Sequence, residues 1–416
     1  MRGGEQEPKV GVRTIFADAA VRTVILIIFV VMLGFGIVAP ILPLYARSFG
    51  VGYDAAGLLI SSFAFARLLV DPVSGPVVDR WGERLSAAVG VTVVGVSSLA
   101  TGLAPTFALA VMFRSAGGAG SALLFTALFS YLLKVVPKDR MARTLSVFYG
   151  AFNVGVIAGG PVGGLIANEM GLAAPLFFYT ALLFVAGALY LRFTRNPEPV
   201  ESTDDPHDRP RAGTLLRTPA FLTTLFLNFA YLWMVAAIYD TLVPLFAHDS
   251  LGMSTLGIGT VFSIALATEL AVLYPAGSAA DRFGRRPVTI PSMAALGVMV
   301  AVLGFSPTPV ALGGLMALLG VASGVAGVPP GAMLSDVAPG GRSGTAVGMF
   351  RFAGDLGFVL GPLVAGWSVN VVGFASAFWV AAIPIALGLA LAVATPETLR
   401  ERREISTPLT ETVGPG

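Results

Sequence analysis

Cysteine is absent from the sequence, and histidine occurs only at His207 and His248. Without thiols the chain can form no disulfide, no thiolate metal site and no cysteine nucleophile. Two distant histidines and the lack of a soluble domain leave no candidate for a clustered metal site or a cofactor-binding loop. We therefore expect no metal, no cofactor and no enzymatic activity.

Charged residues are also scarce, which excludes an ordinary water-soluble protein. Only 12% of the residues are charged while 55% are hydrophobic, and the mean hydropathy is +0.82. A helix needs about 20 apolar residues to cross a bilayer. The sequence predicts an all-α membrane protein with twelve transmembrane helices at residues 22–46, 55–79, 85–104, 107–136, 144–168, 172–193, 219–247, 256–280, 287–306, 309–337, 343–369 and 373–395.

Positive charge is unevenly distributed between the two sides of these predicted spans. Lys and Arg accumulate on the cytoplasmic side of membrane proteins. We therefore expect a multi-pass protein of the cell membrane with a cytoplasmic N-terminal segment, 1–21, and a cytoplasmic tail, 396–416. Of the 26 Lys and Arg residues, the four outside the inner loops and tails are Arg67, Arg114 and Arg351 in spans and Arg47 in an outer loop.

A charged turn occurs twice, as GPVVDRWGERL at residues 75–85 and GSAADRFGRRP at residues 277–287. The same offset of 202 residues pairs Gly50 with Gly252 and continues over more than a hundred positions. A single register of this length is hard to obtain by chance, even in a glycine-rich chain. The sequence therefore predicts a duplicated six-helix unit.

The duplication predicts two pseudo-symmetric six-helix bundles, at residues 22–194 and 219–395. Residues 195–218 between them are rich in proline and in charges of both signs, so we expect a flexible cytoplasmic linker. Two bundles joined by a loose tether can rock against each other. Alternating access to a site near the middle of the bilayer requires such a movement.

The repeated turn resembles the signature of the major facilitator superfamily, G-x-x-x-D-R-x-G-R-R, which lies between helices two and three of these secondary transporters. The second copy matches fully, whereas the first carries Glu83 where the family prefers a basic residue. The resemblance implies the major facilitator fold and an inner gate that latches the halves when the site faces outward. The expected gate residues are Gly75, Asp79, Arg80, Gly82, Arg84, Gly277, Asp281, Arg282, Gly284, Arg285 and Arg286.

The residues of this turn also have a physical interpretation of their own. Gly75 and Gly277 lack side chains where helices two and eight could approach a neighbour closely. Asp79 and Asp281 lie at the cytoplasmic end, where a carboxylate is stabilised by the positive N-terminal end of an adjacent helix, such as helix eleven or five. An alternative is that the arginines simply anchor a short turn to lipid headgroups.

Helix five, with the sequence NVGVIAGGPVGG, resembles the Gly-Pro motif of the twelve-helix drug:proton antiporter branch of this family. It departs from that motif because two glycines lie one residue early relative to the proline. Helix one and Arg114 in helix four also resemble this branch. Plain helix packing is the alternative explanation for the glycines. The expected helix-bend residues are Gly155, Gly159, Gly160, Pro161, Gly164, Gly357, Gly361 and Pro362.

Ionisable side chains within the spans are candidates for function, because a charge there costs at least about 2.5 kcal/mol. Arg67 and Asp71 lie four residues apart on one helical face, and so do Arg351 and Asp355. We interpret both as compensated structural pairs, although Asp71 lies near the inner end and could join the gate. The expected intramembrane charge network comprises Arg67, Arg114 and Arg351.

Asp240 and Glu269 have no opposite charge at a neighbouring helical position in their own spans. Burial disfavours the charged carboxylate, so either acid could bind and release a proton as its exposure changes. The alternative is a static bridge to Arg67 or Arg114. The 202-residue register aligns Glu269 with Arg67, which suggests that the two pair in one state and separate in another. The proton-coupling candidates are Glu269, Asp240, Asp355 and Asp71.

Aromatic and amide side chains are expected to line a cavity suited to amphiphilic, drug-like molecules; the candidates are Phe35, Asn153, Asn228, Tyr231, Trp233 and Tyr239. We expect a monomeric, proton-coupled exporter that brings protons in as its substrate leaves. Its expected partners are a small-molecule substrate, protons and the lipid bilayer, with no nucleic acid. The alternatives are a proton-coupled importer of a metabolite and a membrane sensor or scaffold that does not transport.

Overall fold

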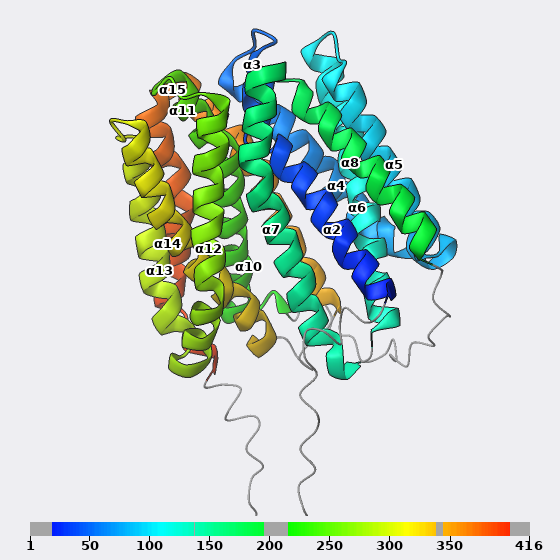
Figure 1. The fold of residues 1–416 in the computed structure, drawn as a ribbon. Coiled ribbons are helices and arrows are strands. Elements are labelled where there is room, and N and C mark those ends of the chain that lie inside the picture. Colours follow the sequence, from blue (N-terminus) through cyan, green and yellow to red (C-terminus); the bar gives the residue numbers. More distant parts are fainter. Residues whose placement is uncertain (1–18, 137, 195–214, 338–343, 400–416) are drawn as a thin grey trace, which may run out of the picture. The chain divides into compact units, whose positions relative to one another are not determined.

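The computed structural model describes residues 19–136, 138–194, 215–337 and 344–399, and the regular elements in these ranges are all helical (Figure 1). The prediction of an all-α membrane fold is confirmed, since the described residues contain eleven apolar helical stretches long enough to cross a membrane. The helices are α2 (Ala19–Val38), α3 (Leu42–Arg47), α4 (Tyr53–Trp81), α5 (Glu83–Gly102), α6 (Phe107–Val135), α7 (Lys138–Met170), α8 (Ala174–Phe193), α10 (Pro219–Met234), η2 (Val235–Leu242), α11 (Val243–Asp249), α12 (Thr255–Phe283), α13 (Arg285–Leu303), α14 (Pro309–Val337) and α15 (Gly344–Ala394).

The longest helix, α15, accounts for the last two predicted crossings. Its 51 residues would extend roughly 75 Å as one straight helix, more than twice the thickness of the bilayer core. Gly373 interrupts it with a φ of 74° and a ψ of 172°, a conformation that residues with a Cβ atom rarely adopt. Two helices therefore meet at Gly373, and the described residues provide the twelve crossings that the sequence predicts.

Two of the predicted helices are interrupted. The first, expected at residues 22–46, is divided between α2 and α3 beside Pro40, which has no backbone N–H to donate. The seventh, expected at residues 219–247, continues from α10 through the π-helix η2 into α11. Hydropathy does not distinguish a π turn from an α turn, so the sequence predicted a regular helix there.

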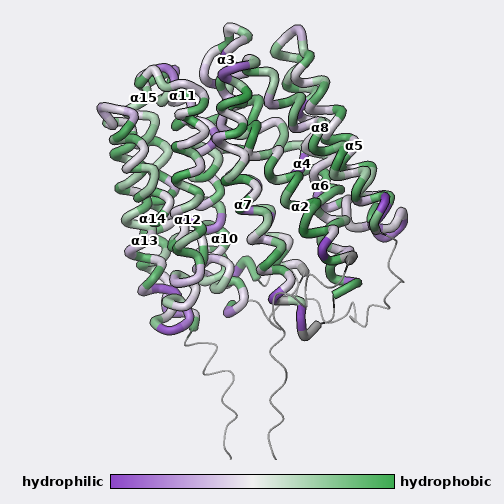
Figure 2. The backbone as a smooth tube through the Cα atoms, viewed as in Figure 1, coloured by the Kyte–Doolittle hydropathy of each residue, from purple (hydrophilic) through white to green (hydrophobic). Residues whose placement is uncertain are grey.

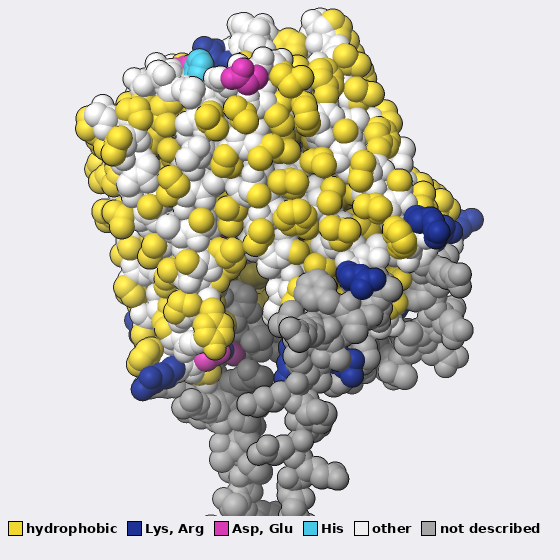
Figure 3. Space-filling model, viewed as in Figure 1, with side chains coloured by type: hydrophobic (Ala, Val, Ile, Leu, Met, Phe, Trp, Pro, Cys, Tyr) yellow, Lys and Arg dark blue, Asp and Glu magenta, His cyan; other side chains and the backbone are white. Residues whose placement is uncertain are grey.

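The outer surface of the helices is apolar. Large side chains such as Leu69, Tyr274 and Val310 are exposed. Figure 2 shows hydrophobic residues along the helices and hydrophilic residues mainly near their ends. In Figure 3 the visible sides of the helices carry mostly hydrophobic side chains, and the Lys, Arg, Asp and Glu side chains lie toward the helix ends. A surface of this kind is stable in contact with lipid.

The described residues form two compact units. The first takes its residues from Met1–Ile41 and Ala66–Thr203, and the second from Leu42–Phe65 and Asp204–Gly416. In the first unit α2 packs against α7 and α8, and α5 packs against α6 and α8. In the second unit α10 packs against α14 and α15, and α12 packs against α14. The second unit thus includes α3 and the first part of α4.

The expected division into bundles at 22–194 and 219–395 stays a prediction. Most of the expected N-terminal segment (1–21), of the linker (195–218) and of the tail (396–416) lies outside the described residues. The last linker residues and the first tail residues are described, and Leu215 is buried in an apolar cluster with Phe221 and Ala346.

Backbone conformation confirms that the fold is pseudo-symmetric. Within the described ranges, every residue with a positive φ is a glycine. These glycines form three pairs, each separated by 202 residues: Gly50 and Gly252, Gly82 and Gly284, and Gly171 and Gly373. Because side-chain-bearing residues are strained at such φ values, the glycines at these turns are required by the backbone in both repeats.

Glycines also allow close helix packing at equivalent places in the two units. In α7, Gly155 and Gly159 face the backbone of α2, so that a Cβ atom at Gly155 would lie 2.7 Å from a carbonyl oxygen. In α15, Gly357 and Gly361 face the backbone of α10 in the same way. Packing therefore accounts for these four glycines of the expected helix-bend motif.

The two packing contacts reveal a small difference between the repeats. Gly155 faces Phe29 whereas Gly357 faces Phe229, an offset of 200 residues in the partner helices. The offset is 202 by Gly50 and Gly252. The second repeat therefore holds two more residues in this stretch, which is the stretch that contains η2.

Candidate functional site

A carboxylate surrounded by hydroxyl groups lies inside the second unit. Glu269 on α12 accepts a hydrogen bond at Oε1 from the Tyr231 hydroxyl, at 2.7 Å. Its Oε2 accepts one from the Ser323 hydroxyl at 2.7 Å and a longer one from the Tyr239 hydroxyl at 3.5 Å. The hydroxyls of Tyr239 and Ser323 lie 2.9 Å apart and are also hydrogen-bonded. We call these four residues the Glu269 cluster.

The π-helix η2 helps to bring both tyrosines to this carboxylate. Tyr231 and Tyr239 are eight residues apart, which on a regular α-helix places them about 80° apart around the axis. A π turn contains more residues and so rotates less per residue. Tyr239 lies within η2, and the Thr241 hydroxyl donates to the Ala236 carbonyl five residues earlier, at 2.8 Å. The wider turn thus reduces the angle between the two tyrosines.

Glycines of α14 bring this helix close to α12 at the level of the cluster. A Cβ atom at Gly324 would lie 2.6 Å from the Glu269 carbonyl oxygen. A Cβ atom at Gly327 would lie 2.8 Å from the ring of Tyr231. Because both positions lack side chains, α14 can approach closely enough for Ser323 to reach Glu269.

The charge of Glu269 is not compensated by a basic side chain within the part of the chain that the structure describes. Its hydrogen-bond partners there are the three hydroxyls, and no Lys or Arg forms an ion pair with it. The residue is half-buried. Since a hydroxyl can donate or accept, this environment can accommodate either a charged or a protonated carboxyl group.

The other candidate acids of the second unit lie apart from these hydroxyls. Asp240 follows Tyr239 on η2 and is buried, and Asp355 on α15 is also buried. Both have interactions of their own. Arg351, one turn before Asp355 on α15, has an exposed side chain. The proposed pairing of Arg351 with Asp355 stays a prediction.

The remaining intramembrane charges belong to the first unit. Arg67 and Asp71 are half-buried on α4, each with interactions of its own. Arg114 is buried on α6, within electrostatic range of Tyr179 on α8. Since Arg67 and Glu269 lie in different units, their suggested pairing stays a prediction.

Of the expected cavity residues, the structure brings only the two tyrosines to Glu269. Asn228 donates to a backbone carbonyl of α15 at 2.8 Å, and the buried Trp233 donates to another at 3.1 Å. Asn153 donates to a carbonyl of its own helix at 2.8 Å. Phe35 is half-buried on α2. The side-chain amides and the indole named here therefore already have backbone partners.

The second copy of the repeated turn holds a buried ion pair. Arg285, at the start of α13, contacts Asp336 at the end of α14 at 2.9 Å and Asp281 at 2.6 Å. The Arg285 and Asp336 side chains are 5% and 0% exposed, whereas the Asp281 side chain is 75% exposed. Arg285 therefore joins three helices at this end of the second unit.

The first copy holds an ion pair of opposite polarity at the equivalent positions. Glu83, at the start of α5, contacts Lys134 near the end of α6 at 2.5 Å and accepts from Ser130 at 2.9 Å. The offset of 202 residues relates Glu83 to Arg285 and Lys134 to Asp336. The departure of Glu83 from the family signature is therefore matched by a reversed charge on its partner.

Other gate residues also have equivalent roles in the two repeats. The Arg84 side chain donates to the Leu191 carbonyl at 2.7 Å, and the Arg286 side chain donates to the Val393 carbonyl at 2.5 Å. Each contact joins a helix start to the last helix of its repeat. The side chains of the remaining charged gate residues are exposed: Asp79, Arg80 and Arg282.

The close approach expected at the gate glycines is not found. A Cβ atom at Gly75 would meet no atom within 4 Å, and one at Gly277 would meet only Val328, at 4.0 Å. Small residues at these positions are therefore not explained by packing in this structure. The proposed contact of Asp79 and Asp281 with the ends of helices eleven and five stays a prediction.

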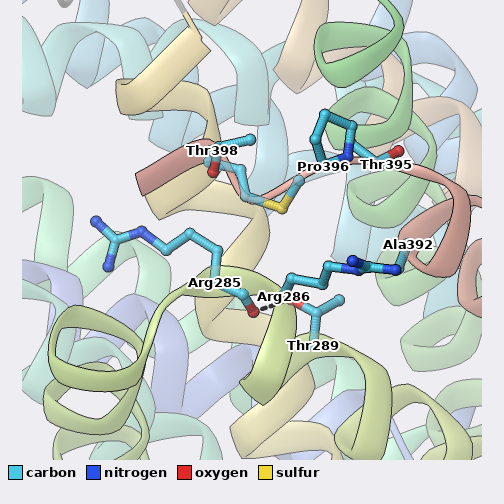
Figure 4. Close-up of a pocket in the computed structure, with 8 residues that line it drawn as sticks. Arg285, Arg286, Thr289, Ala392, Thr395, Pro396 and Thr398 are labelled. Carbon is cyan, nitrogen blue, oxygen red and sulfur yellow. Dashed lines mark hydrogen bonds between the residues drawn. The ribbon is translucent and has the colours of Figure 1, made fainter. Parts of the chain in front are cut away.

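The start of the tail caps α13. The Glu397 carboxylate accepts from the backbone N–H groups of Arg285 at 2.8 Å and Arg286 at 3.0 Å, as a carboxylate does at a positive helix end. Beside it is a cavity of about 10 Å³, room for roughly one water molecule. In Figure 4 the Arg285 and Arg286 guanidinium groups point away from each other around it. This cavity is too small for an organic substrate.

The first part of α4 is bound to the end of α11 and to α15 within the second unit. The Tyr53 hydroxyl donates to Asp249 at 2.8 Å, and the Asn370 side chain donates to Asp54 at 2.8 Å. The backbones also approach closely, since a Cβ atom at Gly57 would collide with the α15 backbone. Residues from the N-terminal half of the sequence are therefore held by helices of the C-terminal half.

Several residues of these sites were not identified from the sequence. Lys134 and Asp336 carry a detectable signal, because the repeat register aligns their opposite charges in the same way as those of Glu83 and Arg285. Ser323 carries none, since a serine in an apolar helix is common and its partner lies on another helix.

Comparisons with known proteins agree with this fold. An uncharacterized MFS-type transporter of Methanocaldococcus jannaschii is 25% identical over 368 residues, covering 85% of this chain and 92% of the relative. The quinolone resistance protein NorA of Staphylococcus aureus is 24% identical over 227 residues, 55% of this chain and 58% of NorA.

Solved structures of transporters have the same fold. The nucleoside transporter NupG superposes with a TM-score of 0.76 at 16% identity, over 90% of this chain and 99% of NupG. A bacterial homologue of the human lysosomal transporter Spinster gives a TM-score of 0.74 at 15% identity, over 92% and 96% of the two chains. The sequence model of the Major Facilitator Superfamily matches residues 24–271 and 249–413. The chain therefore belongs to the Major Facilitator Superfamily, as a multi-pass membrane transporter and not an enzyme.

Proposed function

We propose that this transporter is a proton-coupled exporter of small amphiphilic or drug-like molecules, and that Glu269 carries the proton. The observation that supports proton coupling is a half-buried carboxylate with three hydroxyl partners and no ion pair among the described residues. A charge held in the bilayer by neutral groups alone is costly. Binding a proton removes this cost, and access to water on either side lets the proton leave.

The substrate class is proposed from two observations. NorA, to which part of the chain is similar, is named for quinolone resistance, and quinolones are drug-like molecules. The tyrosines at Glu269 also offer both apolar and hydrogen-bonding surface. The proposal includes a monomer in the cell membrane with cytoplasmic termini, and it keeps Asp240, Asp355 and Asp71 as further candidates for proton transfer.

Transport in proteoliposomes with an imposed pH gradient tests this function. The probes are tetraphenylphosphonium, norfloxacin, uridine and lactose, with a pH-sensitive dye to follow protons. We expect the gradient to drive the cation or the quinolone against the direction of proton flow. Glu269→Gln should abolish gradient-driven accumulation and keep downhill exchange, because glutamine retains the shape but cannot release a proton. The control is Glu169→Gln, at an exposed acid on α7.

Three results would contradict the proposal. Full gradient-driven transport by Glu269→Gln would remove this residue as the proton carrier. Accumulation of uridine or lactose together with protons would favour an importer. Movement of none of the four probes would argue against an exporter of this substrate class.

Alternating access also predicts that the hydrogen bonds at the start of α4 must break during transport. The absence of cysteine makes this testable without background labelling. We expect that joining Asp54→Cys to Asn370→Cys with a short thiol cross-linker stops transport, and that reduction restores it. Each single cysteine variant, treated identically, is the control. Undiminished transport by the cross-linked protein would show that this contact stays closed throughout the cycle.

A further inference from the structure

We infer that Tyr231, Tyr239 and Ser323 are positioning residues that set the proton affinity of Glu269, and that Ser323 changes its hydrogen-bond partner when Glu269 is protonated. The inference rests on the proposed function of Glu269 as the proton carrier. It adds which groups control the proton and how one site can serve both protonation states.

The charged form is held by hydroxyl donors on both carboxylate oxygens. Tyr231 donates to Oε1, while Ser323 and, at longer distance, Tyr239 donate to Oε2. Hydrogen bonds to a charged group are shorter and stronger than neutral ones, and the two bonds of 2.7 Å are of this short kind. Removing either of these donors therefore weakens the charged form more than the neutral form.

The protonated form needs an acceptor for its own O–H group, and Ser323 can provide one. The Ser323 hydroxyl also lies 3.1 Å from the Gly320 carbonyl of its own helix. When Glu269 gains a proton, Ser323 can turn its hydrogen to Gly320 and accept the new O–H from Oε2. Its second lone pair accepts from Tyr239, at 2.9 Å. The change requires only that hydroxyl groups rotate.

The cluster also connects the proton to the geometry of helix seven. Tyr239 lies in η2, whereas Tyr231 lies in the preceding regular helix. A conversion of the π turn to an α turn would rotate Tyr239 relative to Tyr231. Tyr239 would then lose its contact with Ser323 and Glu269, so movement of this helix would change the proton affinity of Glu269.

The other ionisable groups on the helices that pack against Glu269 lie next to η2 or near the helix ends. On the described elements in contact with α12, and on α12 itself, they are Asp240 on η2, His248 and Asp249 on α11, Tyr274, Asp281 and Arg282 on α12, Arg285 and Arg286 on α13, and Asp336 on α14. The two tyrosines of the cluster are the titratable groups that hydrogen-bond to Glu269.

Infrared titration of the purified full-length protein tests the inference without requiring a substrate. The C=O band of a protonated carboxyl group appears as the pH falls. We expect one such band to be absent in Glu269→Gln, which assigns it to Glu269. The pH at which this band reaches half its intensity reports proton binding, and its frequency reports hydrogen bonding to the carboxyl group.

We expect graded shifts among the variants. Tyr231→Phe and Ser323→Ala should each move the half-intensity pH upward by about one unit, because each removes a short bond to the charged form. Tyr239→Phe should shift it less, since its bond to Glu269 is long. Ser323→Ala should also change the band frequency. The matched controls are Tyr274→Phe on α12 and Ser335→Ala on α14, both exposed, and they should leave both values unchanged.

The outcomes separate this inference from the proposed function. If Glu269→Gln loses coupled transport but the three cluster variants titrate like the native protein, the inference is wrong and the proton carrier stands. If Glu269→Gln transports normally, the proposed function fails whatever the spectra show. Absence of any band removed by Glu269→Gln would also overturn the inference, since no proton would then be bound by the cluster.

Discussion

Glu83→Arg is expected to lower the free energy of unfolding by about 3 to 5 kcal/mol, the usual cost of breaking a buried ion pair. The new arginine would face Lys134, which contacts Glu83 at 2.5 Å in the native protein. The Glu83 side chain is only 3% exposed, so water cannot compensate for the lost partner. Lys134→Asp alone should be similarly harmful, because two carboxylates would then face each other.

Combining Glu83→Arg with Lys134→Asp should restore most of the stability. The double variant recreates in the first repeat the polarity that Arg285 and Asp336 have in the second. The measurement is the midpoint of thermal unfolding of the detergent-purified protein, followed by the loss of its monodisperse peak in size-exclusion chromatography. Glu169→Arg is the control, since it makes the same change at an exposed residue.

If the double variant were no more stable than either single variant, the charge of the pair would not be what matters. Recovery would show that either polarity can join the third helix of a repeat to the fourth. The family signature would then describe one of two interchangeable solutions at this position.

Gly163→Ala is expected to destabilise the protein by about 3 kcal/mol, at the upper end of the usual cost of overpacking. Gly163 faces the carbonyl group of Ile37 across the contact between α7 and α2, and an added Cβ atom would collide with it. A backbone carbonyl cannot turn aside as a flexible side chain can. The two helices would have to separate, which would also disturb the neighbouring contact at Gly159.

Gly150→Ala on the same helix is the matched control, because nothing lies within 4 Å of the position that its Cβ atom would occupy. There the substitution should be neutral or stabilising by up to about 1 kcal/mol, since alanine has the higher helix propensity. Both variants are compared with the native protein by thermal unfolding in the same detergent. Equal stability of the two variants would show that α2 and α7 are not held by this close approach.

These predictions concern the framework, whereas the proposed function depends on Glu269. The glycines and ion pairs hold neighbouring helices together within each unit. Glu269, in contrast, is held by hydroxyl groups that can exchange donors for acceptors. This difference explains why we expect variants of the first kind to change stability and variants of the second kind to change coupling to protons.

Much of the architecture can be read from local composition. Hydropathy locates the twelve crossings because each crossing needs its own continuous apolar stretch, whatever its neighbours are. The repeated turn reveals the duplication because equivalent backbone conformations at Gly82 and Gly284 require the same residue type. An acid such as Glu269 stands out in the sequence because a charge within an apolar stretch is costly wherever the helix packs.

The partners of these residues depend on how the helices are rotated and placed against one another, which a single stretch of sequence does not record. Ser323 reaches Glu269 because Gly324 and Gly327 let α14 approach, and serine costs too little in a helix to be noticed beforehand. The π segment places Tyr239 through a change in backbone hydrogen bonding that hydropathy does not detect. The reversed ion pairs at Glu83 and Arg285 likewise become evident as contacts only once the helices are packed.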